Sequence, residues 1–274
     1  MRSQAMDDIE FHVIERIQSL RESADSFDWL EDLMQYAEQV RAELEEVDTK
    51  MFQKLRAQIN LESYRGKPLM NLMNEYLDRS RDSAIQQYET GYDHLDLFLN
   101  GLLTYRELPV ETKEREPGMI YYQKTPARII FELIEKAALQ PGDVFYDLGS
   151  GPGQVTMLVN LLTSIISRGI EFEPAFCNYA KARASELNLS QVDFINADAR
   201  HADYSSGNVF FMYTPFEGQM LRDVLSNLHT EAEKRQIRIF TYGSCTSDVG
   251  RLHWLRQINK TQNSLIELAE FVSV

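Results

Sequence analysis

The residues best placed to do chemistry form a glycine-rich turn, Asp147-Leu148-Gly149-Ser150-Gly151-Pro152-Gly153-Gln154. An apolar stretch runs straight into this turn and a helical pattern follows it. Glycine is needed where the backbone takes a positive φ or must approach a ligand closely. In an open α/β sheet such turns lie at the carboxyl ends of strands, where ligands bind. The turn therefore predicts a ligand site, with a purely structural turn as the alternative. The candidate residues are Asp147, Gly149, Gly151, Gly153 and Gln154.

The residues around the glycines indicate which ligand the turn would accept. A dinucleotide fingerprint needs a third small residue three places after Gly151, but Gln154 stands there. The turn also lacks the lysine of a nucleoside-triphosphate loop. Asp147 would repel a pyrophosphate and attract a cationic amino-acid group. The pattern favours a ligand that carries an ammonium or sulfonium and argues against a nucleotide-dependent oxidoreductase.

Two later acids follow predicted strands and extend this site. Glu171 ends the second strand, where an acid can accept both hydrogen bonds of a ribose diol. Asp198 follows the third strand and could accept from an exocyclic amine. Ala199 could donate its backbone N–H to a ring nitrogen. A surface acid at Glu171 and an ordinary loop or helix-cap acid at Asp198 are the alternatives.

The elements that must position these residues alternate between strand and helix after residue 117. Such alternation predicts βαβ units and a parallel sheet. Thr125 is expected to cap the first helix, with Pro126 at its first position. The end of the chain is expected to form an antiparallel hairpin at one edge. We expect strands at 144–148, 170–172, 192–196, 209–213 and 237–242, and helices at 126–139, 154–167, 174–187 and 217–228.

The preceding residues read as helix throughout. An apolar stripe at steps of three and four predicts one long helix capped by Ser26. An earlier segment, 9–20, repeats this pattern, and helices are expected again at 69–88 and 94–105. The stripe favours an intramolecular core, and a homodimer through these helices is the alternative. We expect a helical bundle domain over residues 1–116, ending in the connector 107–118, and a doubly wound α/β domain over 117–274. The stripe comprises Leu30, Leu33, Ala37, Val40, Leu44, Val47, Met51 and Leu55.

Composition narrows the class of protein further. The 274 residues are 43% hydrophobic and carry a net charge of −14, concentrated before residue 117. Such acidity argues against direct nucleic-acid binding, although cationic partners fit it. We find no signal-peptide pattern and no apolar run that could span a membrane, and the two cysteines lack metal-site spacing. The expected protein is cytoplasmic, binds no membrane and holds no metal.

The motifs together resemble the class I S-adenosylmethionine-dependent methyltransferases over about residues 121–242. The matching segments are DLGSGPGQV, GIEFEP, NADA and FFMYTPF. The first looks most like the loop of the histone-lysine methyltransferases named for disruption of telomeric silencing. Those enzymes also have a Tyr-x-x-Thr element, here Tyr122 to Thr125. The resemblance implies S-adenosyl-L-methionine as cofactor and implies that Tyr122 and Thr125 cover its methionine end.

Two departures from that family bear on the acceptor substrate. The histone enzymes have an Asn-Asn pair after the fourth strand, where this chain has Tyr213 and Thr214. The chain is also acidic, whereas the histone enzymes are expected to reach the nucleosome through basic segments. Both departures argue against a nucleosomal substrate and leave lysine methylation open. We expect in-line methyl transfer to an amine, of a protein lysine or a small molecule, beside a wall that includes Tyr213 and Phe216. A cofactor-binding interaction protein without efficient transfer activity is the rival hypothesis.

Overall fold

The computed structural model describes residues 28–62, 64–82, 92–105, 107–258 and 267–274. The chain divides into two compact units, residues 1–61 and residues 62–274. The first unit contains the helix α2, Asp28–Asn60, which confirms that one helix runs through the predicted stripe. Ser26 and the segment 9–20 lie outside the described residues. The predicted domain division after residue 116 stays a prediction.

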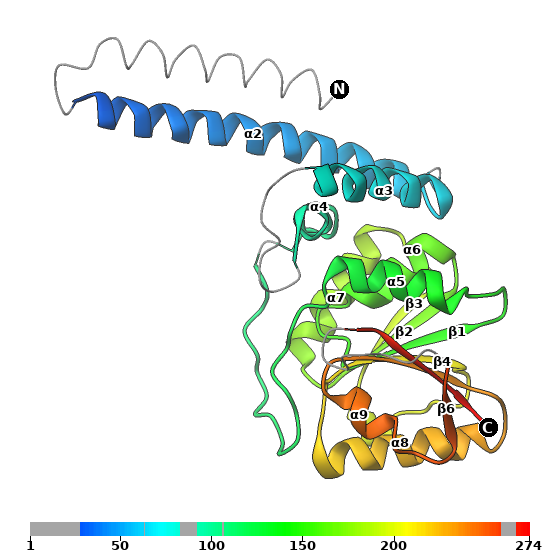
Figure 1. The fold of residues 1–274 in the computed structure, drawn as a ribbon. Coiled ribbons are helices and arrows are strands. Elements are labelled where there is room, and N and C mark those ends of the chain that lie inside the picture. The colour runs from blue at the N-terminus through cyan, green and yellow to red at the C-terminus, as the bar shows by residue number, and fades with distance from the viewer. Residues whose placement is uncertain (1–27, 63, 83–91, 106, 259–266) are drawn as a thin grey trace. The chain divides into compact units, whose positions relative to one another are not determined.

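The second unit is a three-layer α/β fold (Figure 1). Helices α5, α6 and α7 cover one face of the sheet and α8 and α9 the other. Its helices are α3 (Lys67–Asp82), α4 (His94–Leu103), α5 (Ala127–Ala137), α6 (Gln154–Thr163), α7 (Pro174–Glu186), the 3₁₀ helix η1 (Ala199–His201), α8 (Gly218–Ala232) and α9 (Cys245–Val249). Its strands are β1 (Val144–Leu148), β2 (Ile166–Glu171), β3 (Val192–Asn196), β4 (Val209–Tyr213), β5 (Arg238–Tyr242), β6 (Leu255–Gln257) and β7 (Ala269–Ser273).

The sheet has the order β3-β2-β1-β4-β5-β7-β6. The first five strands in this order pair in parallel, and β7 pairs antiparallel with both β5 and β6. The chain order reverses between β1 and β4, which creates a switch point where ligands bind beyond the carboxyl ends of the strands. The predicted doubly wound sheet with an antiparallel C-terminal hairpin is therefore confirmed.

Three local predictions are wrong, each for a local reason. Helix α5 begins at Ala127 with Pro126 as its cap, one residue later than expected, and Thr125 does not cap it. Helix α6 ends at Thr163 because Ser164 adopts a left-handed conformation, with φ 60°, and its N–H bonds to Asn160. Strand β2 can therefore begin at Ile166, four residues earlier than expected. The short helix α9 was not predicted.

The predicted connector does connect the helices to the sheet. In residues 107–118 the structure shows turns and extended backbone. The expected helices at 69–88 and 94–105 correspond to α3 and α4, although residues 83–91 lie outside the description. Within the described residues, no helix combines the length and the apolar character that crossing a membrane requires.

Candidate functional site

The glycine turn packs so tightly that larger residues would not fit. Gly149, Gly151 and Gly153 all have positive φ angles, of 75°, 53° and 87°. A Cβ added at Gly149 would lie 2.3 Å from the Cβ of Pro215, and one at Gly151 would lie 2.5 Å from the ring of Tyr122. The turn thus brings the backbone of one strand end against segments that come from elsewhere in the chain. Gly153 caps helix α6.

Asp147 lies next to the end of β1 and faces the cavity in front of this turn. It is 3% exposed, and its carboxylate accepts a hydrogen bond of 3.1 Å from the Thr156 hydroxyl. Burial raises the pKa of Asp147 to about 7, and the charge of Glu171 adds to this effect. An ionised Asp147 is therefore short of stabilising partners, and a cationic ligand group would supply one.

Gln154 and Ser150 are buried polar residues at the cavity whose side-chain polar atoms find no hydrogen-bond partner among the described residues. Gln154 is 3% exposed and lines the cavity, yet its amide oxygen and nitrogen find no hydrogen-bond partner among the described residues. The Ser150 hydroxyl, which also lines the cavity, likewise finds no hydrogen-bond partner among the described residues. Buried polar groups are normally satisfied, so unpartnered groups at a cavity wall indicate where a ligand would bond. Ser150 was not among the residues predicted from the sequence.

Glu171 ends β2 and supports the glycine turn. Its carboxylate accepts hydrogen bonds from the backbone N–H of Gly151 at 2.6 Å and of Glu173 at 2.7 Å. Burial raises its pKa even though these donors act in the opposite direction. Each carboxylate oxygen has a second lone pair. Glu171 can therefore hold the turn and still accept from a ligand diol.

Glu173, two residues further on, has the opposite environment. Its carboxylate accepts from the Thr112 hydroxyl at 2.6 Å and from the backbone N–H groups of Thr112, Lys113 and Ala175, each at 2.8 Å. Burial alone would raise its pKa, but these hydrogen bonds together lower it to about 2. Glu173 caps α7 and ties the connector to the cavity rim. Its position directly before Pro174 is the signal that could have identified it.

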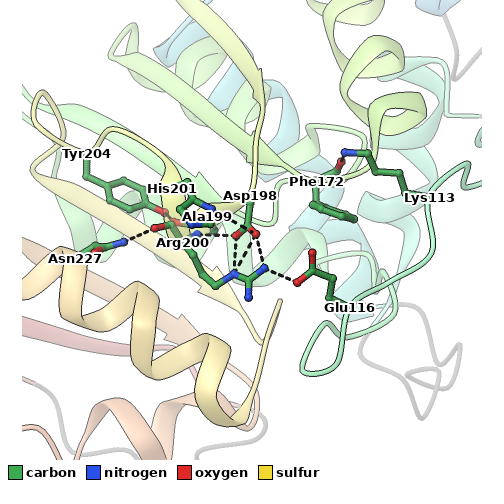
Figure 2. Close-up of polar contacts among 9 residues, drawn as sticks. All are labelled: Lys113, Glu116, Phe172, Asp198, Ala199, Arg200, His201, Tyr204 and Asn227. Atoms are coloured by element: carbon green, nitrogen blue, oxygen red, sulfur yellow. Dashed lines mark hydrogen bonds and ion pairs between the residues drawn. The ribbon is translucent and has the colours of Figure 1, made fainter.

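Asp198 is held by Arg200 (Figure 2). The Arg200 Nε donates to both carboxylate oxygens, at 3.1 and 3.0 Å, and this side-chain bonding lowers the pKa of Asp198. Arg200 also pairs with Glu116 of the connector. Asp198 and the buried Ala199 both line the cavity, and their contact with an adenine stays a prediction. The structure adds that Asp198 is part of an ion-pair network that links the rim to the connector.

An aromatic wall forms part of the lining of the cavity. Tyr122, Tyr213 and Phe216 all line it. Burial raises the pKa of Tyr122 and of Tyr213, so both phenols stay neutral at physiological pH. The wall is fixed by backbone bonds, because Ile120 N–H donates to Pro215 at 3.0 Å. It offers π faces and neutral hydroxyl groups.

Thr214 lies where the histone-lysine methyltransferases that the glycine turn resembles have an asparagine. Its φ is 37°, in the left-handed region that β-branched residues rarely adopt. Its hydroxyl donates to the Tyr242 carbonyl at 3.3 Å and accepts from the Cys245 N–H at 3.3 Å. The Thr214 side chain therefore bonds to the turn that follows β5.

These groups surround one cavity of about 1020 Å³, its open mouth included. Gly151 and Gly153, although part of the turn, are not among the residues that line the cavity. The predicted residues that line the cavity are Tyr122, Thr125, Asp147, Gly149, Gln154, Glu171, Asp198, Ala199, Tyr213 and Phe216.

The residues present fit S-adenosylmethionine. The unpartnered amide of Gln154 and the raised pKa of Asp147 suit an amino-acid group, and Glu171 suits a ribose diol. The tight approach of Tyr122 and Pro215 to the glycines leaves no room for side chains in the turn. No group of three or more His, Cys, Asp or Glu side chains in the described part of the chain could hold a metal ion.

Comparison with known proteins agrees with this site. Residues 118–224 match the model of a family described as "Histone methylation protein DOT1". The matched segment includes the glycine turn, both later acids and the aromatic wall. The fold and the match together identify the α/β unit, which contains the matched segment, as a class I S-adenosylmethionine-dependent methyltransferase. Within that class, this segment resembles the DOT1 family.

Several solved methyltransferase structures resemble this chain, at low sequence identity and with low TM-scores. An RNA methyltransferase from Salinibacter ruber, in complex with S-adenosyl-L-homocysteine, has 22% identity and a TM-score of 0.44 over 55% of this chain and 92% of its own. A putative methyltransferase from Escherichia coli has 13% identity and a TM-score of 0.45 over 57% and 90%. Each TM-score lies below 0.5, so the fold assignment rests on the strand order. No curated protein sequence matches the chain.

Proposed function

We propose that the protein transfers a methyl group from S-adenosylmethionine to an amine nitrogen, of the lysine type on a protein. The observation that carries this proposal is that Tyr122, Tyr213 and Phe216 line the cofactor cavity. Aromatic faces stabilise the positive charge that an amine gains when it is methylated. The description of the matched family, histone methylation, supports an amine acceptor.

The chain's own residues would bind and orient the reactants. Asp147 and Gln154 would hold the amino-acid end of the cofactor, Glu171 the ribose, and Asp198 with Ala199 the adenine. When bound, the cofactor supplies an already activated methyl group. The protein must therefore align the acceptor and exclude water, which accounts for several orders of magnitude in such reactions.

The acceptor nitrogen would have to arrive as a neutral amine. Tyr122 and Tyr213 remain phenols because burial raises their pKa, so neither is available as a phenolate base. Their oxygens can accept a hydrogen bond from an amine N–H. We assign Tyr213 and Phe216 to the acceptor end of the cavity. The acceptor ammonium would lose its proton to water before the amine enters the cavity.

The acidic surface of α2 favours a cationic partner over a nucleic acid. Exposed acids recur along this helix, for example Glu38, Glu43 and Glu45. A lysine-rich protein would be attracted to such a surface. The missing asparagine at Thr214 and this acidity are the grounds for proposing a non-nucleosomal acceptor.

The test is methyl transfer with a labelled methyl group on S-adenosylmethionine. The full chain is incubated with a lysine-rich peptide panel, total cellular protein, RNA and small amines, and Glu171→Ala serves as the matched inactive control. Label on protein amine nitrogen is the expected result. Label confined to RNA or small molecules would overturn the acceptor class. Cofactor binding without label in any acceptor would instead favour an interaction protein.

A further inference from the structure

The helix α4 lies outside the matched segment, yet it and the residues at its two ends contact two segments that contribute residues to the cofactor cavity. Its N-terminus is fixed by a reciprocal cap, in which Asp93 accepts from Leu95 at 2.8 Å and Asp96 accepts from Asp93 at 3.1 Å. The buried Asp96 also accepts from the backbone N–H of Ala127, at 3.0 Å. One side chain thus joins the start of α4 to the start of α5.

Lys124 makes the first connection between α4 and the cavity. Its ammonium donates to Asn100 at 2.8 Å and lies 3.4 Å from a carboxylate oxygen of Asp96. Its backbone carbonyl accepts from the Tyr92 hydroxyl at 2.5 Å. Burial lowers the pKa of Lys124, which shows that the ammonium depends on these partners. The residue is therefore held from the α4 side through both its backbone and its side chain.

The position of Lys124 in the chain gives this contact its meaning. It lies between Tyr122 and Thr125, both of which line the cavity, whereas Lys124 itself does not. The ring of Tyr122 packs against Gly151 of the glycine turn. A shift of Lys124 would therefore move the two residues assigned to the methionine end of the cofactor.

Tyr105 makes the second connection. It follows the end of α4, and its hydroxyl donates to the carbonyl of Pro152 in the glycine turn at 2.6 Å. Burial raises the pKa of Tyr105 well above its ordinary value, so the group stays a neutral donor. Tyr179 of α7 secures the helix end by donating to Thr104 at 3.0 Å, and its ring lies 5.8 Å from that of Tyr105.

We propose that residues 92–105 position two segments of the cofactor site. Tyr105 acts as a positioning residue for the glycine turn. Lys124, which residues 92–105 hold in place, acts as a positioning residue for the Tyr122 to Thr125 segment. The proposal rests on the cofactor assignment of the proposed function and is independent of the acceptor. Neither residue touches the cofactor directly. Each acts by fixing a segment that does, so their removal should weaken binding of the cofactor more than it weakens the fold.

The first test compares Tyr105→Phe with Tyr179→Phe in the full chain. Both variants lose one phenol hydroxyl from the same aromatic pair, but only Tyr105 bonds to the glycine turn. Losing one hydrogen bond to the turn should weaken S-adenosylhomocysteine binding about fivefold, measured by calorimetry. Tyr179→Phe should bind S-adenosylhomocysteine within about twofold of wild type, although its melting temperature should be equal to or lower than that of Tyr105→Phe. Equal affinities for the two variants would overturn the role of Tyr105.

The second test uses rescue at Lys124. Lys124→Met should weaken S-adenosylhomocysteine binding about tenfold because it leaves Asp96 without its cation. Lys124→Arg keeps the charge and should recover most of the affinity. If Lys124→Met unfolds the chain, the double variant Asp96→Asn with Lys124→Met removes the unpaired charge and takes its place. Unchanged binding in the folded variant, or no recovery with arginine, would overturn the role of Lys124. Absence of binding by wild type would instead contradict the cofactor assignment.

Discussion

The floor of the cavity comprises Asp147, Gln154 and Glu171, and its rim is formed where Glu173 meets the connector. Both contain buried acids, but the environments of these acids differ. On the floor, Asp147 and Glu171 have raised pKa values, and the Gln154 amide has no partner among the described residues. At the rim, Glu173 accepts four hydrogen bonds, which lower its pKa. The floor is short of hydrogen-bond and charge partners that a ligand can supply. The rim already has them and holds the connector in place.

The largest expected effect on cofactor affinity is at Glu171. Glu171→Ala removes both acceptors for the ribose diol and the acceptor of the Gly151 N–H. Two charge-assisted hydrogen bonds of about 1.5 kcal/mol each correspond to a loss of roughly 100-fold in affinity for S-adenosylhomocysteine. Calorimetric titration measures this loss, with the exposed Glu114→Ala as the control at wild-type affinity. Unchanged binding in Glu171→Ala would remove this acid from the site.

A change of pH should alter binding through Asp147. The pKa of Asp147 is raised from its ordinary value to about 7. Ionising Asp147 therefore destabilises the unliganded fold as the pH rises from that ordinary value through about 7. A bound ammonium group reverses this cost, so affinity rises as the pH rises through the same range. We expect affinity for S-adenosylhomocysteine to increase by up to about tenfold from pH 6 to pH 8. Glu171 acts in the same direction.

The control for this pH prediction is Asp147→Asn. The variant cannot ionise, so its weaker binding should lose most of the pH dependence over this range. A wild-type affinity that is flat with pH, or that falls between pH 6 and pH 8, would contradict the assignment of Asp147 to a cationic group.

Gln154 should give two effects of opposite sign. Gln154→Leu removes a buried amide that has no partner among the described residues, so the unliganded protein should melt at an equal or higher temperature. The same change removes a ligand partner, so affinity for S-adenosylhomocysteine should fall about fivefold. Thermal unfolding with and without ligand measures both. A lower melting temperature together with unchanged affinity would show that the amide has a structural role only.

The smallest expected effect on affinity is at the rim. Glu173→Gln weakens several charge-assisted hydrogen bonds to the connector and to α7, which should lower the free energy of unfolding by about 1–2 kcal/mol. Affinity for S-adenosylhomocysteine should change less than about threefold, since no ligand group is assigned to Glu173. Chemical denaturation and calorimetry test the two values. A loss of affinity as large as that of Glu171→Ala would erase the distinction between floor and rim.

Sequence patterns predicted the floor better than the rim for a physical reason. Asp147 and Glu171 lie at the ends of strands and Gln154 begins the helix after the turn, and strand ends in a parallel sheet converge on one edge. Glu116 and Thr112 reach the rim through a connector without regular structure, so no periodic pattern places them. Likewise, the contact of Tyr105 with Pro152 joins residues 47 apart, which local spacing does not reveal.

The elements show the same distinction between regular and local signals. The five parallel strands and the C-terminal hairpin were predictable because apolar runs alternate with helical periods. The start of α5 was one residue off because proline can cap a helix as well as begin it. The end of α6 depends on the left-handed backbone of Ser164, which composition does not indicate.

The most direct test of the account is calorimetric titration of the full chain with S-adenosylhomocysteine at pH 8. We expect one site per chain, with affinity tighter than millimolar and strongly reduced by Glu171→Ala. No binding at millimolar ligand would contradict it. Equal affinity for a nicotinamide dinucleotide would do so as well, because Asp147 should reject a pyrophosphate.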